Sequence, residues 1–185
     1  TSPAIPPQAF GDYNTAIMMA AGLLGALVNK LRTGKGDKVV VNLYHSAIWG
    51  GSIGLCAQQF GADYPKSRTD VPNPFNNMYC CADGKWVCVC LPEYDRDWPR
   101  VMKLIGRDEL AEHAEYSVCT TVNAKGLAAE VTKILDEGFA QFTRDELLAM
   151  FKENDMPCEP AATPTDIYED QNCWDNDMLV KIPYP

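Results

Sequence analysis

The feature that most constrains this chain is an uncharged run from Tyr13 to Asn29. It is short for a bilayer span, which needs about 20 apolar residues, and glycine and asparagine interrupt it. We therefore expect a buried helix of a soluble domain, capped by Asp12 and running to Arg32. Its small residues indicate close approach by another element, because each glycine costs a helix about 1 kcal/mol relative to alanine.

Residues 33–61 predict the rest of an α/β layer. The glycine turn at 33–37 ends the first helix. It lacks the Walker spacing and precedes a strand instead of following one, which favours a turn over a phosphate loop. The nearly continuous apolar run at 38–43 predicts a strand buried on both faces. A second helix rich in glycine and alanine is expected from Ser46 to Phe60, ended by Gly61.

A change in composition then marks a boundary. Prolines and asparagines crowd residues 62–77, which predicts an extended connector. Residues 78–81 and 85–91 flank Ala82-Asp83-Gly84, a hairpin signal. On the second strand, Cys88 and Cys90 should share one face.

Three helical signals follow the hairpin. Pro99 suits the first residue of a helix that ends at Gly106. A stripe of apolar residues predicts another helix, and Thr143 with Glu146 forms a capping box for a third. The stripe consists of Leu127, Val131, Ile134 and Leu135.

The predicted fold class is α/β, with a small α+β domain in the second half. Residues 1–64 are expected to be the remnant of a larger α/β domain with helix–strand–helix order, 65–77 a connector, and 78–185 the small domain. Both ends are rich in proline and stop in mid-pattern, so we expect a piece of a longer polypeptide.

The composition of the chain limits the classes of function it can have and indicates its cellular compartment. Of 185 residues 46% are hydrophobic, which is enough for a sizeable core. Acidic residues outnumber basic ones by 25 to 16, giving a net charge of −9. This balance argues against nucleic-acid and anionic-membrane partners. Eight cysteines without a signal peptide indicate a reducing compartment, and we expect a cytoplasmic protein.

The cysteines of the hairpin raise the question of a metal. Cys80, Cys81, Cys88 and Cys90 lie on its two arms and could converge. Zinc sites usually use Cys-x₂-Cys knuckles, and no histidine is near these four. Free cysteine behaves as a small hydrophobe, so we favour buried packing residues over a metal site or a redox pair, and expect no metal.

Two histidines and one carboxylate occupy positions where catalytic groups occur. His45 lies at a strand-to-helix junction, where a hydrogen-bonded structural role is the commoner one, and His113 lies in a charged, solvated stretch. Glu93 follows the second hairpin strand. It is either a catalytic carboxylate at a strand end or part of a solvated, acidic helix entry.

The asparagines of the connector are the candidate ligand-binding side chains. Asn73, Asn76 and Asn77 offer amides to a polar ligand, although turn propensity explains them equally well. A Ser-His-Asp or Cys-His arrangement cannot be built from this sequence.

A resemblance to family III CoA-transferases covers essentially the whole chain, because the motifs occur in order and with sensible spacing. The first half carries Gly11-Asp12-Tyr13-Asn14-Thr15 and then residues 33–43. The second half carries residues 73–79, 82–86, 94–97, 104–107, 154–158 and 166–168. The run from Pro65 to Trp98 is most similar to the branch that moves CoA between 2-hydroxy acids and enoyl-CoA esters.

The resemblance implies transfer of CoA from an acyl-CoA to a carboxylate. An aspartate would attack the thioester and form an anhydride. No cofactor would be tightly bound, coenzyme A thioesters would be substrates, and the full-length protein would be an interlocked homodimer. That aspartate is expected upstream of Gly11, so this chain alone should be inactive.

One departure from the family concerns the loop over the intermediate. Formyl-CoA transferases carry a glycine-rich loop where this chain has residues 71–77, which puts a lid role for that loop in doubt. In related acyl-CoA racemases a glutamate base follows the equivalent strand, and Glu93 falls at about that place. The continuation Tyr94-Asp95-Arg96-Asp97 resembles the transferase branch. The alternatives are therefore a racemase or epimerase of the same fold, and a non-catalytic truncated binding or assembly module.

Overall fold

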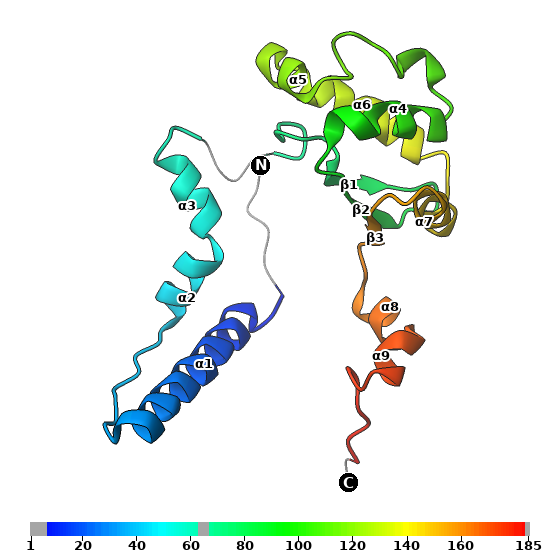
Figure 1. Cartoon of the computed structure of the whole chain (residues 1–185). Coiled ribbons are helices and arrows are strands. Elements are labelled where there is room, and N and C mark those ends of the chain that lie inside the picture. The colour runs from blue at the N-terminus through cyan, green and yellow to red at the C-terminus, as the bar shows by residue number, and fades with distance from the viewer. Residues whose placement is uncertain (1–6, 63–66, 184–185) are drawn as a thin grey trace. The chain divides into compact units, whose positions relative to one another are not determined.

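The computed structural model describes residues 7–62 and 67–183, and the chain divides into two compact units with the boundary between Lys66 and Ser67. The helices and strands of both units are labelled in Figure 1. Each unit is described by itself below.

The first unit is helical and is dominated by α1, Phe10–Thr33. The helix starts two residues before the predicted Asp12 cap. Its N-cap is Ala9, in the left-handed region at φ 57°, so Asp12 lies in the first turn. At the other end Gly34, at φ 75°, donates its N–H to the Lys30 carbonyl at 2.8 Å. The predicted glycine ending is confirmed.

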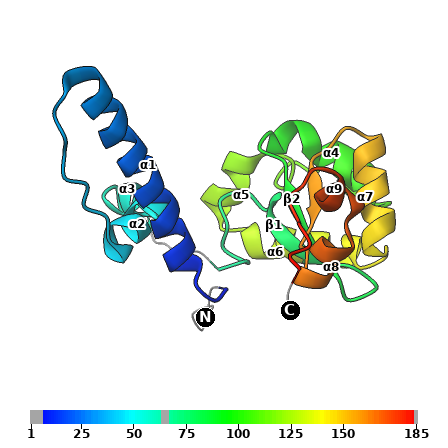
Figure 2. The same cartoon turned by 90° about the horizontal axis from the view of Figure 1, so that it is seen from below.

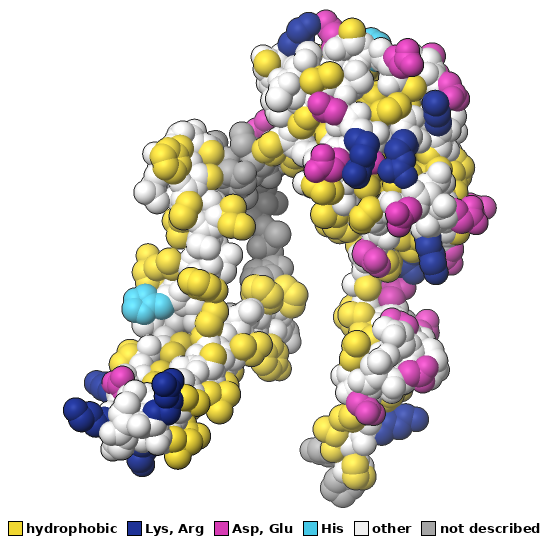
Figure 3. Space-filling model, in the orientation of Figure 1, with side chains coloured by type: hydrophobic (Ala, Val, Ile, Leu, Met, Phe, Trp, Pro, Cys, Tyr) yellow, Lys and Arg dark blue, Asp and Glu magenta, His cyan; other side chains and the backbone are white. Residues whose placement is uncertain are grey.

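The faces of α1 are exposed. Of its residues only Thr15 is buried, and large side chains such as Leu24 and Leu31 are 63% and 77% exposed. The prediction of a buried helix is therefore wrong for the described residues. Length and composition alone would allow α1 to cross a membrane, a weak test that core helices and signal sequences also pass. Figure 3 shows hydrophobic side chains over much of the visible face of this unit.

Residues 35–42 have no regular secondary structure and pair with no strand in the described chain. The strand predicted at 38–43 is therefore not formed, because an apolar run becomes a strand only beside hydrogen-bonding neighbours. The segment does return along α1. A Cβ added to Gly22 would lie 2.7 Å from Val39 Cγ1, which confirms a close approach there, whereas at Gly25 it would meet nothing within 4 Å.

The second predicted helix is split in two. It forms α2, Leu43–Gly50, and α3, Ser52–Gln58, with Gly51 between them. Asn42 caps α2, since its side-chain oxygen accepts the His45 N–H at 2.9 Å. The helical region thus begins earlier than predicted and is broken at the glycine pair.

The second unit is built on a small antiparallel sheet of order β1-β2-β3. Its strands are Asn76–Cys80, Trp86–Cys90 and Cys158–Pro160. The predicted hairpin is confirmed, with Gly84 at φ 74° in its turn and Met78 opposite Cys88. The three-residue β3 was not predicted. It places Cys158 opposite Val89.

Helices pack on one face of this sheet, as Figure 2 shows from below. They are α4 (Tyr94–Leu104), α5 (Cys119–Lys125), α6 (Ala128–Phe139) and α7 (Arg144–Glu153), with a 3₁₀ turn at Asp108–Leu110. α6 contacts β1, and α7 contacts β2 and β3. Val87 and Val89 are fully buried on this side, while Cys88 and Cys90 are exposed on the other.

The core of the unit is aromatic. Phe75 and Tyr94 have ring centroids 4.8 Å apart, and the Tyr79 ring meets Phe139 edge-on at 5.0 Å. The predicted stripe on α6 is confirmed, with Val131 and Leu135 fully buried. This one core unites the end of the connector, the sheet and the helices α4 to α7.

The start of α4 differs from the prediction. The helix begins at Tyr94, so Pro99 lies inside it and not at its first position. Proline removes one helical hydrogen bond. This loss is offset because the preceding turn buries Tyr94 and Trp98, and burying two aromatic side chains is worth more than one hydrogen bond.

α7 begins as predicted. The Glu146 carboxylate accepts the Thr143 N–H at 2.9 Å, and the Thr143 hydroxyl accepts the Glu146 N–H at 3.4 Å. Two short helices follow β3, α8 at Pro164–Glu169 and α9 at Gln171–Asp175. Arg144 ties α7 to α8 through the Asp166 carboxylate at 2.9 Å.

Side chains and prolines occupy the outer edges of the sheet. Beside β1, Arg68 donates its Nε–H to the Met78 carbonyl at 2.9 Å, and its guanidinium pairs with Asp136 on α6. β3 ends at Pro160, which has no N–H to offer at the outer edge, while the Pro157 carbonyl before the strand accepts the Cys90 N–H of β2 at 3.4 Å.

Candidate functional site

The asparagines of the connector meet the end of β2. Asn73 donates from Nδ2 to the Leu91 carbonyl at 3.0 Å, and its Oδ1 accepts the Phe75 N–H at 2.8 Å. Both the nitrogen and the oxygen of the side-chain amide are therefore hydrogen-bonded to backbone atoms. Leu91 N–H in turn donates to the Phe75 carbonyl at 3.3 Å, which fixes the start of β1 beside the exit from β2.

Asn77 is engaged in the same way. It donates from Nδ2 to the Arg68 carbonyl at 2.9 Å and accepts the Met78 N–H at 2.9 Å. Asn76 differs: it pairs with Cys90 in the sheet and its side chain is exposed. Of the three predicted amides, Asn76 is the exposed one, and the other two are hydrogen-bonded to backbone groups.

Glu93 lies at the same end of the sheet, three residues after Cys90. It is the N-cap residue of α4, but its side chain makes no capping hydrogen bond and is exposed. A cavity of about 230 Å³ opens beside it. Its other walls come from residues 92–96 and from Cys119 at the start of α5. Asn76, which pairs with Cys90, and Glu93, which follows that strand, are thus both exposed at the same end of the sheet, although Asn76 does not line this cavity.

Cys119 and Asp95 were not predicted as neighbours of this site. The Asp95 carboxylate accepts the Cys119 N–H at 2.7 Å, and the Cys119 thiol donates to the Pro72 carbonyl at 3.3 Å. Burial and the Asp95 charge raise the pKa of Cys119, so it stays a protonated thiol. Asp95 and Cys119 are 24 positions apart, and no sequence pattern relates them. Only the fold shows that they are neighbours.

A buried carboxylate supports the helix behind Glu93. Asp97 is fully buried and accepts from Arg96 Nε at 3.0 Å, from Arg96 Nη2 at 2.9 Å and from Arg100 Nη1 at 2.7 Å. The Arg96 hydrogen bonds, with that of Arg100, hold the pKa of Asp97 below its ordinary value. This cluster fixes the first turn of α4 and is structural.

The hairpin cysteines divide between two environments. Cys81 is buried, Cys80 is half-buried, and Cys88 and Cys90 are exposed. The prediction that all four pack as buried residues is therefore wrong for Cys88 and Cys90, because the strand alternation turns them to the open face of the sheet. Within residues 7–62 and 67–183 no group of three or more His, Cys, Asp or Glu side chains is placed to hold a metal ion.

Both histidines make local contacts. His45 donates its backbone N–H to Asn42, and its Nδ1 lies 3.1 Å from Asn42 Nδ2. This is the hydrogen-bonded role predicted for it, although it lies in the first turn of α2 and follows no strand. His113 is half-buried instead of solvated, since it stacks on Tyr116 with ring centroids 4.0 Å apart.

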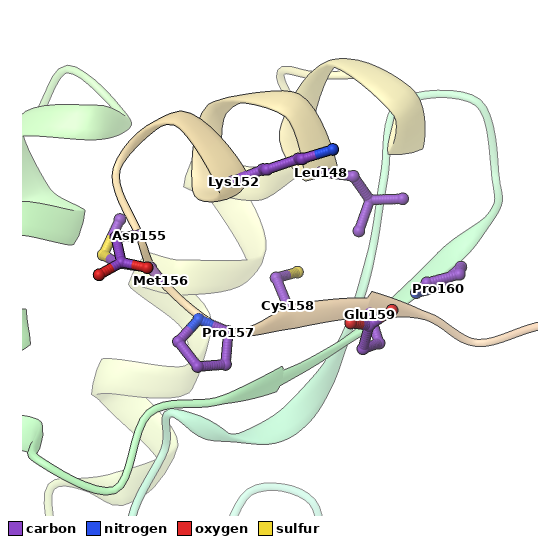
Figure 4. Close-up of a pocket in the computed structure, with 8 residues that line it drawn as sticks. All are labelled: Leu148, Lys152, Asp155, Met156, Pro157, Cys158, Glu159 and Pro160. Atoms are coloured by element: carbon purple, nitrogen blue, oxygen red, sulfur yellow. The ribbon is translucent and has the colours of Figure 1, made fainter.

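A larger groove of about 600 Å³ lies between α7 and β3. Figure 4 shows the Cys158 side chain pointing from β3 toward α7, with Lys152 along the opposite wall. Burial raises the pKa of Cys158 to about 12, so its thiol is not a nucleophile near neutral pH. None of the predicted site residues lines this groove, and we assign it no chemistry.

Comparison with known sequences decides the family. The chain matches CoA-transferase family III over residues 1–185. The chain belongs to this family. The resemblance inferred from its motifs is thereby confirmed.

Two curated relatives are similar to the chain over nearly its whole length. The chain is 37% identical, over 98% of its length, to a cinnamoyl-CoA:phenyllactate CoA-transferase of Clostridium sporogenes. It is 35% identical, over its full length, to an (R)-2-hydroxy-4-methylpentanoate CoA-transferase of Clostridioides difficile. These matches cover 45% and 46% of those proteins, so the family III chain spans about half the length of the curated relatives.

Solved structures agree at the level of fold. A protein of Mycobacterium tuberculosis aligns with 95% of this family III chain at a TM-score of 0.74 and 22% identity. A CAIB/BAIF family protein from Brucella suis aligns with 96% at a TM-score of 0.74 and 23% identity. The mixed fold of helices with a small antiparallel sheet is therefore shared with these proteins.

Proposed function

We propose that this chain is part of an enzyme that moves CoA from the thioester of a 2-hydroxy or α,β-unsaturated acid to a free carboxylic acid. The observation that carries the proposal is the full-length family match together with two relatives, more than a third identical, that are named for such acids.

The proposed reaction begins with an aspartate upstream of Gly11. Its carboxylate attacks the thioester carbonyl, the C–S bond breaks, and CoA leaves as a thiolate while an acyl-aspartyl anhydride forms. The thiolate then attacks the aspartyl carbonyl and releases the first acid. The second acid repeats the exchange in reverse, so no external oxidant or proton donor is required.

This chain would contribute the polar end of the β1–β2 hairpin. Asn76 and Glu93 are its exposed side chains there, and Asn73 clamps the loop that carries Asn76 to the residue that follows β2. We propose that Asn76 and Glu93 contact the substrate acid. The full protein would work as an interlocked homodimer in the cytoplasm, without tightly bound cofactors and without nucleic-acid or membrane partners.

The test compares this chain with a version extended upstream through the expected aspartate. Cinnamoyl-CoA is the donor, and 3-phenyllactate, 4-methylpentanoate and acetate are the acceptors. We expect CoA transfer by the extended version only. Transfer by the shorter chain would overturn the upstream placement of the nucleophile. No transfer by either would overturn the transferase proposal in favour of a non-catalytic module.

Two variants of the extended version test the hairpin residues. Glu93→Gln and Asn76→Ala should each lower kcat/KM at least tenfold, while Glu112→Gln, an exposed glutamate beyond α4, serves as the matched control. Exchange of the substrate α-proton in deuterated water that depends on Glu93 would instead favour the racemase.

A further inference from the structure

The turn that carries Asn76 is tied to the sheet on one side. Within this turn, residues 73–76, the Asn76 N–H donates to the Asn73 carbonyl at 2.9 Å. The Asn73 side chain and the Phe75 carbonyl are both hydrogen-bonded to Leu91, which follows β2. The Phe75 ring is fully buried in the core. These contacts hold the turn from the side of the sheet.

Helix α5 holds the same turn at a second place. The Pro72 carbonyl, directly before the turn, accepts two hydrogen bonds from this helix. One comes from Asn123 Nδ2 at 2.8 Å and the other from the Cys119 thiol at 3.3 Å. Asn123 Nδ2 also donates to the Cys119 carbonyl at 3.0 Å, which orients the side-chain amide toward Pro72.

The two donors of α5 are not required to satisfy a buried group. Pro72 is an exposed residue, and water can satisfy an exposed carbonyl nearly as well as a protein donor does. What the two donors add is a fixed position. A turn that is held at one place can rotate about it, whereas a second anchor on a different element fixes its orientation.

Cys119 also connects the turn to the segment that carries Glu93. Its backbone N–H donates to the Asp95 carboxylate at 2.7 Å. Glu93, Asp95 and Cys119 line the same cavity. The start of α5 therefore contacts both parts of the proposed site, the turn with Asn76 and the segment with Glu93.

We infer that Asn123 and Cys119 are positioning residues that determine where Asn76 lies relative to Glu93. The inference rests on the proposed function, which assigns substrate contact to Asn76 and Glu93. The two residues of α5 act through the Pro72 carbonyl. The ability of Asn123 to donate a hydrogen bond is therefore what matters, and its size is not.

Asn123 is the residue to change, because it is exposed and its replacement leaves the core intact. Asn123→Ala removes the amide, and Asn123→Asp keeps the size but has no N–H to donate at neutral pH. Asn176→Ala is the matched control. Asn176 is also exposed, and it also donates from Nδ2 to the carbonyl four residues before it, that of Asn172, at 3.0 Å.

The first experiment measures amide hydrogen exchange in the 185-residue chain by mass spectrometry. In both Asn123 variants we expect residues 73–77 to exchange at least about threefold faster than in wild type, since the loss of one hydrogen bond favours local opening by this order. Exchange in α6 should not change, nor should exchange at residues 73–77 in Asn176→Ala. Unchanged exchange at residues 73–77 in the Asn123 variants would overturn the inference, and so would an equal increase in α6.

The second experiment measures whether Asn123 acts through Asn76. In the extended version, Asn123→Ala should lower kcat/KM for CoA transfer at least about threefold, but less than about 1.5-fold when Asn76→Ala is already present, because residues that act through one contact have non-additive effects. An equal loss in both backgrounds would indicate a general structural role and overturn the inference. If no protein transfers CoA but exchange at residues 73–77 still depends on Asn123, the proposed function fails while the positioning of the turn stands.

Discussion

At the scale of single residues, Asp97 shows how one buried charge can determine where a helix begins. A carboxylate without access to water is stable only when its oxygens are paired, and two guanidinium groups meet this need. Since Arg96 is adjacent and Arg100 is one turn on, the cluster forms only if residues 96–100 are helical. This requirement outweighs the presence of Pro99 within the turn.

Replacing Asp97 should therefore weaken the second unit. Asp97→Ala removes three charge-assisted hydrogen bonds, but the two arginines remain partly hydrated. We expect a loss of about 2 kcal/mol in the free energy of unfolding, measured by urea denaturation at pH 7. Asp145→Ala, at a carboxylate that is 82% exposed, should change it by less than about 0.5 kcal/mol.

The same residue makes a prediction about pH. The pKa of Asp97 is lower in the folded chain than in the unfolded one, where it is about 3.9. Its contribution is complete above the unfolded value and is lost as the pH falls through the folded one. As the pH falls below about 4, wild type should lose more stability than Asp97→Asn; parallel curves would contradict this assignment.

The cysteines should react in two classes. Burial raises the pKa of Cys81 to about 11 and that of Cys158 to about 12, while Cys88 and Cys90 are exposed. Because the thiolate is the reacting form, iodoacetamide at pH 8 should alkylate the exposed pair at least about tenfold faster. Peptide mass spectrometry over time measures this, and urea should abolish the difference. Similar alkylation rates for all four cysteines in the folded chain would contradict the burial of Cys81 and Cys158.

At the scale of helices and strands, glycines in α1 and α6 have opposite roles. Gly25 faces open space, whereas a Cβ at Gly138 would overlap the Ile105 side chain. Ile105 follows α4 and is buried, so Gly138 allows α6 to approach it closely.

Two alanine substitutions should therefore act in opposite directions. Gly138→Ala should destabilise the second unit by about 1–3 kcal/mol through overpacking. Gly25→Ala should stabilise α1 by up to about 1 kcal/mol through helix propensity. Circular dichroism during urea denaturation measures both changes, and a stabilising Gly138→Ala would contradict the close approach of α6 to Ile105.

The elements predicted correctly are those whose causes are local in sequence. The hairpin follows from its turn, and α7 follows from the Thr143–Glu146 box. The strand at 38–43 was predicted wrongly because strands need partners that a local pattern does not reveal. β3 was missed because three residues carry no measurable alternation.

The candidate site was predictable only as a set of residue types. The sequence indicated Glu93 and the asparagines by their position beside a strand. It could not reveal that the side chains of Asn73 and Asn77 are hydrogen-bonded to backbone carbonyls. Those carbonyls belong to Leu91 and Arg68, which are distant in sequence. Nor could it place Cys119 beside Glu93, since this depends on how helices pack.

At the scale of the whole molecule, the two units differ in how they bury apolar surface. The second encloses one continuous core. In the first, large apolar side chains of all three helices remain exposed, among them Leu31, Trp49 and Ile53. Monomeric proteins rarely expose contiguous apolar patches of this kind.

We therefore expect this chain to self-associate through the helical unit. Sedimentation velocity should show species larger than a monomer at high concentration. A shorter version comprising residues 67–185, which retains the entire core, should remain monomeric and unfold cooperatively. A strictly monomeric full chain would contradict this prediction, as would association of the shorter version.

Blocked backbone hydrogen-bonding groups along the outer strands of the sheet affect the kind of aggregate that such association can produce. Exposed strand edges invite strand addition and growth into fibrils. Here the arginine at 68 occupies a carbonyl along the first strand, and the proline at 160 offers no N–H along the outer side of the third. Association of this chain should therefore be reversible, driven by side chains, and free of amyloid character.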